Sequence, residues 1–113
     1  MRDRLVLATR GSALALAQAN HVADALRAAW PGLAVDLTII IQDVPQSPVS
    51  PELALRIAER SGSARMVKVE SLPVVARVAA MAETAGDRLM IFGGAGGTYF
   101  IEEMRRGARG TMP

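Results

Sequence analysis

The sequence predicts an α/β fold in which parallel strands alternate with amphipathic helices. Short apolar or β-branched runs are separated by longer segments whose apolar residues recur at helical spacing. The length of 113 residues and the 50% hydrophobic content fit one globular domain. Strands that are joined by helices run parallel, with right-handed crossovers. We therefore predict a single three-layer domain over residues 1–113, with a five-stranded parallel sheet in the flavodoxin-like order 2-1-3-4-5.

The first βαβ unit is predicted from its apolar runs and its helix signals. Residues 5–9 form an apolar strand, and Ser12 can cap the helix that follows. The Trp-Pro-Gly sequence at 30–32 ends this helix, because proline cannot continue it. Residues 35–41 include three consecutive isoleucines and form a second strand whose two faces are both expected to be buried.

The rest of the chain repeats the same alternation. Ser50 is an N-cap candidate followed by Pro51 and Glu52, a strong helix start, and Gly62 closes that helix. Thr98 is the predicted cap of the last helix. The remaining strands are predicted at 65–70, 89–92 and 110–112, and the remaining helices at 71–85 and 98–106.

Polar residues follow several of these strands. Parallel sheets bind ligands at the carboxyl ends of their strands, so we expect these side chains to meet at one rim. The residues expected there are Thr9, Arg10, Gln42, Asp43, Lys68, Glu70 and the glycine loop at 93–97. The loop lacks the Lys-Ser/Thr ending of a phosphate-binding P-loop, but its backbone amides could hold an adventitious anion.

Composition and charge exclude several classes of protein. The absence of cysteine excludes disulfides and thiolate catalysis, and a single histidine argues against a metal site. The formal charge of +2 is spread along the chain, so we expect no nucleic-acid partner. No apolar run has the length of a membrane span, so we expect a cytoplasmic protein without a membrane partner. We expect no cofactor, and either a monomer or a homodimer.

Residues 8–18, Ala-Thr-Arg-Gly-Ser-Ala-Leu-Ala-Leu-Ala-Gln, resemble a signature of the hydroxymethylbilane synthase (porphobilinogen deaminase) family. The resemblance covers residues 1–40 and implies the amino-terminal βαβ unit of that family. It also implies that Arg10 and Ser12 bind carboxylate groups, which agrees with an arginine beside free amides at a helix start. The cofactor of that family is attached to a cysteine, so we do not expect deaminase chemistry here.

Residues 41–113 resemble a different family, the dihydrodipicolinate synthases and related class I aldolases. The matching segments are Gln42-Asp43-Val44-Pro45, Ser50-Pro51-Glu52-Leu53, Val67-Lys68-Val69-Glu70, Phe92-Gly93-Gly94 and residues 107–112. The resemblance implies the carboxyl-terminal half of a TIM barrel and makes Lys68 the Schiff-base lysine. The family's proton-relaying tyrosine is replaced by Gln42, and its threonine pair belongs to the other half of the barrel. We therefore expect aldolase chemistry to be crippled.

Two resemblances that meet inside one strand predict an engineered chimera with no evolved catalytic activity. Alternatively, Lys68 retains Schiff-base chemistry with keto acids, or the rim binds carboxylate or phosphate weakly. The residues predicted to bind such a ligand are Arg10, Ser12, Gly93, Gly94, Gly96 and Gly97. A simpler interpretation of Lys68 is that it only forms a salt bridge with Glu70, Asp43 or another neighbour.

Overall fold

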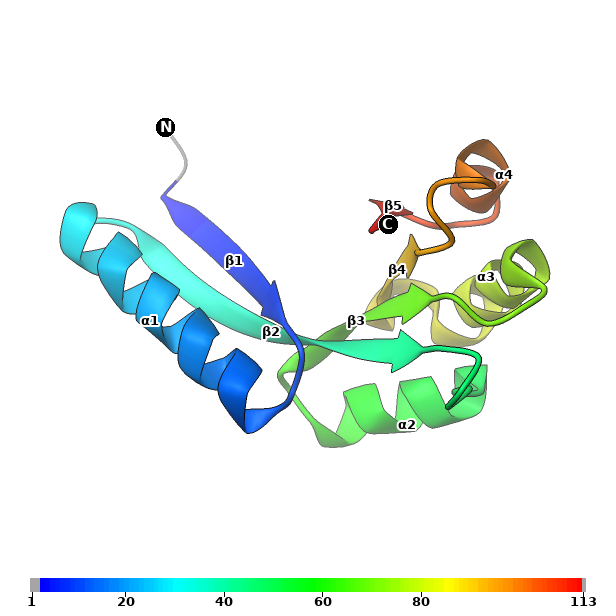
Figure 1. The fold of residues 1–113 in the computed structure, drawn as a ribbon, viewed down its shortest axis with the longest axis horizontal. Coiled ribbons are helices and arrows are strands. Elements are labelled where there is room, and N and C mark those ends of the chain that lie inside the picture. The colour runs from blue at the N-terminus through cyan, green and yellow to red at the C-terminus, as the bar shows by residue number, and fades with distance from the viewer. Residues whose placement is uncertain (1–2, 113) are drawn as a thin grey trace. The chain divides into compact units, whose positions relative to one another are not determined.

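A computed structural model describes residues 3–112 of the chain (Figure 1). The chain divides into two compact units, Met1–Ile40 and Ile41–Pro113. The boundary lies inside one long strand, β2 (Ala34–Asp43), at its run of isoleucines.

The first unit contains β1 (Arg4–Thr9), α1 (Ala13–Ala29) and the greater part of β2. β1 and β2 pair in parallel, from Arg4 opposite Ala34 to Thr9 opposite Ile39. The helix starts where the sequence predicts, because the Ser12 hydroxyl accepts a hydrogen bond from the amide of Ala15 at 3.2 Å.

The second unit continues from the end of β2 through three further helices and three further strands. The strands are β3 (Ala64–Val69), β4 (Met90–Gly93) and β5 (Gly110–Thr111). The helices are α2 (Pro51–Arg60), α3 (Val74–Ala85) and α4 (Phe100–Arg105), with a 3₁₀ turn, η1, at Gly86–Arg88. The core of this unit contains Ala54, Val67, Val69, Val78, Met81 and Ile91, each at most 2% exposed.

The strand order is β1-β2-β3-β4-β5, so the predicted α/β class with a five-stranded parallel sheet is confirmed and the predicted order 2-1-3-4-5 is wrong. In the flavodoxin-like order β1 lies between β2 and β3, whereas here β1 pairs with β2 and is an edge strand. Each crossover instead adds its strand next to the preceding one, as in a segment of a (β/α) barrel. Buried parallel strands have the same apolar pattern in both arrangements, so the sequence pattern did not distinguish them.

The last helix differs from its prediction. It begins at Phe100 rather than directly after Thr98, and its N-cap residue, Tyr99, makes no side-chain capping hydrogen bond. The amide of Thr98 instead closes a turn on the carbonyl oxygen of Ala95. The loop therefore runs one residue further than predicted, and α4 is a short helix.

Successive residues of a strand point to opposite faces, and the second unit follows this rule. In β3, Val67 and Val69 are fully buried, whereas Met66 and Lys68, which alternate with them, are half-buried. Helices α2 and α3 both pack on β3. Lys68 therefore lies on the face of the strand opposite to the buried valines, in register with Phe92 of β4.

Candidate functional site

Lys68 and Glu70 form an ion pair at the carboxyl end of β3. The Lys68 Nζ atom lies 2.6 Å from Glu70 Oε1, and the two side chains are 19% and 27% exposed. The residues are two apart, so both side chains project from the same face of the chain. The predicted salt bridge of Lys68 with a neighbouring acid is therefore present, with Glu70 as the partner.

Gly94 lies directly over this pair. A Cβ atom at position 94 would come within 2.6 Å of Lys68 Cε and 2.5 Å of Glu70 Cγ, so only glycine fits there without displacing them. The structure thus brings together three of the residues that were predicted to meet at the rim. A carbonyl compound that reached this cluster would meet one amine, one carboxylate and the backbone of the glycine loop.

The four candidate glycines of the loop have two different structural roles. At Gly93 and Gly94 the side chains of other residues pack closely on the backbone, so that an added Cβ would have to displace one of them. Gly96 and Gly97 have φ angles of 64° and 75°, in the left-handed region that favours glycine, with open space around them. The fold therefore explains all four glycines without a bound anion.

Glu103 is a buried acid that the sequence analysis did not single out. It belongs to α4 and is 1% exposed, and neither carboxylate oxygen has a hydrogen-bond partner among the described residues. Burial raises the pKa of this carboxyl above its ordinary value. Nothing in the order Ile101-Glu102-Glu103-Met104 distinguishes this acid from Glu102, so only the packing of α4 reveals it.

Asp43 does not join the Lys68 cluster, although it ends β2 as predicted. Its Oδ1 atom accepts hydrogen bonds from the Val49 amide at 2.9 Å, the Ser71 hydroxyl at 2.8 Å and Arg77 Nη2 at 2.8 Å. Its Oδ2 atom accepts a further bond from Arg77 Nε at 2.9 Å. The carboxylate is fully buried, and its role is structural: it ties the loop after β2 to α3.

The protonation of Asp43 follows from these contacts. Burial alone would raise the pKa of this carboxyl, but the hydrogen bonds from Arg77, Val49 and Ser71 and the charge of Arg77 outweigh it and lower the pKa. Asp43 is therefore a carboxylate at neutral pH, and both of its oxygens accept hydrogen bonds from the guanidinium of Arg77.

Arg10 and Ser12 lie in the first unit, at the start of α1. The Ser12 hydroxyl is engaged in the helix cap, and Arg10 is exposed, with no side-chain hydrogen bond or ion pair to residues 3–112. The neighbouring Thr9 hydroxyl donates to the backbone carbonyl of Arg10 at 3.1 Å. Of these side chains, only Arg10 is available to a solution anion.

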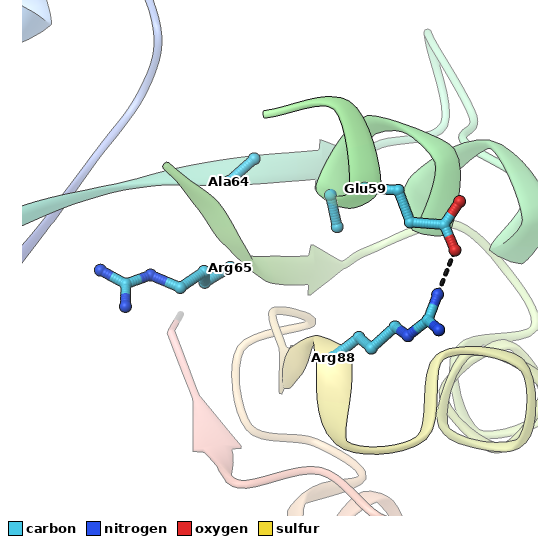
Figure 2. Close-up of a pocket in the computed structure, with 5 residues that line it drawn as sticks. Glu59, Ala64, Arg65 and Arg88 are labelled. Atoms are coloured by element: carbon cyan, nitrogen blue, oxygen red, sulfur yellow. Dashed lines mark hydrogen bonds and ion pairs between the residues drawn. The ribbon is translucent and has the colours of Figure 1, made fainter. Parts of the chain in front are cut away.

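A separate hollow of about 310 Å³ lies at the start of β3, at the other end of the strand from Glu70. It is lined by Ala58, Glu59, Ala64, Arg65 and Arg88. Figure 2 shows Arg88 bound to Glu59, while Arg65 points away from this ion pair. Two of the three charged side chains that line the hollow thus pair with each other, and the lining residues do not form a pair of nucleophile and base.

The described part of the chain holds neither a metal-binding cluster nor a membrane-spanning helix. Residues 3–112 contain no group of three or more histidines, aspartates or glutamates arranged to hold a metal ion. No helix within the same range is both long and apolar enough to cross a membrane.

The chain is similar to porphobilinogen deaminases over part of its length. It is 48% identical over 52 residues to the enzyme of Maridesulfovibrio salexigens and 45% identical over 56 residues to that of Syntrophobacter fumaroxidans. These matches cover 41% and 43% of this chain but only 17% and 18% of the relatives. The high identity is thus confined to a small part of each deaminase.

The structure is similar to a different group of proteins. It matches dihydrodipicolinate synthase from Rhodopseudomonas palustris with a TM-score of 0.59 and 27% identity, over 82% of this chain and 33% of that one. It matches a dihydrodipicolinate synthase family protein from Coccidioides immitis with a TM-score of 0.57 and 17% identity, over 97% of this chain and 34% of that one. The second match shows the fold alone. No protein-family model matches the chain. The chain therefore combines sequence similarity to deaminases with structural similarity to dihydrodipicolinate synthases, and spans about a third of the latter.

Proposed function

We propose that this protein is an engineered chimeric scaffold: a deaminase-like βα fragment joined to a fragment of a dihydrodipicolinate synthase-like barrel, without evolved catalytic activity. The observation that carries the proposal is the double similarity, to deaminases in sequence and to dihydrodipicolinate synthases in structure. The boundary between the compact units inside β2 supports it, because a joint within a shared strand keeps the hydrogen-bond ladder continuous.

The state of Lys68 supports the absence of efficient catalysis. A Schiff-base lysine must present a free amine to the substrate carbonyl, but Nζ lies 2.6 Å from Glu70 Oε1 in an ion pair within the protein. Gln42 stands at the start of the Gln-Asp-Val-Pro segment where the family resemblance places the tyrosine that relays protons. A glutamine amide is neither an acid nor a base at neutral pH, so it cannot replace a proton-relaying tyrosine at this position.

Thermal melting tests the scaffold proposal. We expect one melting temperature, unchanged by millimolar pyruvate or porphobilinogen, because a ligand stabilises a protein only by binding its native state. A saturable, stoichiometric rise in melting temperature with either compound would contradict the proposal.

A second candidate function is residual Schiff-base chemistry at Lys68. It is favoured by the 27% identity to dihydrodipicolinate synthase over 82% of the chain. In this reaction Glu70 takes a proton from the Lys68 ammonium, and the free amine attacks the carbonyl carbon of a 2-keto acid. The carbinolamine then loses water to form an imine. The reaction ends at this covalent adduct, and the enzyme-like release of a product is not part of the proposal.

Borohydride trapping with pyruvate tests this second candidate. Reduction converts the imine to a stable secondary amine, which peptide mass spectrometry locates. Lys68 is the only lysine, so the terminal amine is the one competing primary amine of the chain. We expect slow labelling at Lys68 that Lys68→Arg abolishes and Glu70→Gln alters. Labelling confined to the amino terminus would exclude this function.

Anion binding is a weaker proposal, and the free guanidinium of Arg10 is the observation that favours it. Calorimetry with citrate and phosphate should show binding in the millimolar range or weaker, as expected for one exposed cation with a helix start. Arg10→Gln should remove that heat. If Arg10→Gln left the titration unchanged, the heat would come from another site, such as the Gly93–Gly97 loop.

A further inference from the structure

Helix α4 exposes its apolar side chains and buries one of its two acids, Glu103. Ile101 is 64% exposed, Phe100 42% and Met104 40%, whereas Glu103 is buried. A surface helix of a globular protein ordinarily places its apolar stripe against the core and its charges toward water. The exposed side chains of α4 therefore form an apolar surface. Covering this surface would be favourable, because it would remove apolar side chains from water.

Two hollows lie beside this apolar surface. A hollow of about 290 Å³ lies beside the first turn of α4, lined by residues 97–102. A second hollow, of about 380 Å³, joins Tyr99 to the start of α3 and to Leu72, which is 75% exposed. Apolar side chains and hollows at one helix end can accept apolar side chains from another helix.

The charges on α4 are arranged so that the helix complements itself. Glu102 and Arg105 are both exposed and lie 3.5 Å apart, one turn from each other. If a second α4 lies antiparallel to the first, Glu102 of each copy comes beside Arg105 of the other. The same arrangement brings Ile101 beside Met104 of the other copy and directs that Met104 toward the hollow at the first turn.

We propose that α4 is the contact surface of a two-fold symmetric homodimer, formed by antiparallel packing of α4 against α4 of a second copy. A two-fold contact must present one patch that complements itself, and the pattern Ile101-Glu102-Glu103-Met104-Arg105 does so in both charge and apolar contact. A different protein would need no such self-complementarity. The second copy is therefore the partner that these residues favour.

Sedimentation equilibrium over a wide concentration range tests the proposal. We expect a reversible monomer–dimer equilibrium for the unaltered protein. Ile101→Glu should shift it to monomer, because a charge would be buried in the contact. The matched control is Leu53→Glu on α2, which also replaces an apolar side chain, 43% exposed, and should leave the dimer intact. A monomer at every concentration, or a dimer that Ile101→Glu leaves intact, would overturn the proposal.

Charge reversal gives a second test that does not depend on apolar burial. Glu102→Arg and Arg105→Glu should each weaken the homodimer about tenfold or more, because like charges then oppose each other across the contact. An equimolar mixture of the two variants should form a heterodimer, since every cross-contact then joins opposite charges. The doubly swapped chain should also dimerise. A mixture that associates no better than either variant alone would contradict antiparallel pairing, and melting curves check that each variant is folded.

Discussion

The carboxylate of Glu103 lies against the backbone of Gly93, in the space that a side chain at position 93 would fill. A Cβ atom there would be 1.4 Å from Glu103 Oε2. Gly93 ends β4, and its carbonyl oxygen accepts a hydrogen bond from the amide of Met112 at 2.8 Å. The absence of a side chain at position 93 therefore leaves the space that the carboxylate of Glu103 occupies.

Gly93→Ala should destabilise the protein by about 1 kcal/mol, because an added methyl group must displace the carboxylate end of the buried Glu103 side chain. Urea unfolding measures the change. The matched control is Gly62→Ala, where an added Cβ meets nothing within 4 Å. Equal effects of the two substitutions would show that Glu103 does not occupy the space beside Gly93.

Glu103→Gln should stabilise the protein at pH 7 and have little effect at pH 4. Burial raises the pKa of Glu103 above its ordinary value of 4.5, so the native state keeps a proton that the unfolded chain has lost. The stability is therefore full below about pH 4.5 and falls as the pH rises through the native pKa. The side-chain amide of glutamine carries no charge, so Glu103→Gln removes this loss of stability at high pH.

Urea unfolding at the two pH values, compared with the exposed neighbour variant Glu102→Gln, measures the contribution of Glu103. An equal effect of Glu103→Gln at both pH values would mean that the carboxylate finds water or a partner.

Asp43→Asn should cost about 3 kcal/mol at neutral pH, because it leaves the Arg77 guanidinium without its buried partner. The pKa of Asp43 is lowered in the native state, so its contribution is present above the ordinary value of 3.8 and is lost as the pH falls through the native pKa. Asp43→Asn should therefore flatten the loss of stability in acid.

The control for Asp43 is Asp24→Asn, which removes a pair with Arg27 in which the acid is 77% exposed. That substitution should cost about 0.5 kcal/mol. Similar losses for both variants, in urea unfolding at pH 7 and pH 3, would contradict the buried network around Asp43.

The sequence predicted the helices and strands well where the signal is local. Ser12 and Ser50 cap their helices as expected, since a cap depends on amides within three residues of the hydroxyl. The strand order was not predictable from local pattern, because an apolar parallel strand looks the same in a doubly wound sheet and in a barrel segment.

The same distinction between local and distant contacts applies to the candidate site. The pairing of Lys68 with Glu70 could be predicted, because the two residues lie on one face of one strand. The burial of Asp43 could not, because its partner Arg77 lies 34 residues further along the chain and nothing local marks the pair. Glu103 was missed for a related reason: its inward direction depends on a glycine ten positions earlier that makes room for it.

The most direct test of the scaffold proposal is a steady-state turnover assay with pyruvate and, separately, with porphobilinogen, on protein shown to be folded by its melting curve. The account predicts rates equal to those of the buffer, and equal for the unaltered protein and for Lys68→Arg. Saturable product formation at rates typical of enzymes, about 1 per second or faster, would contradict it.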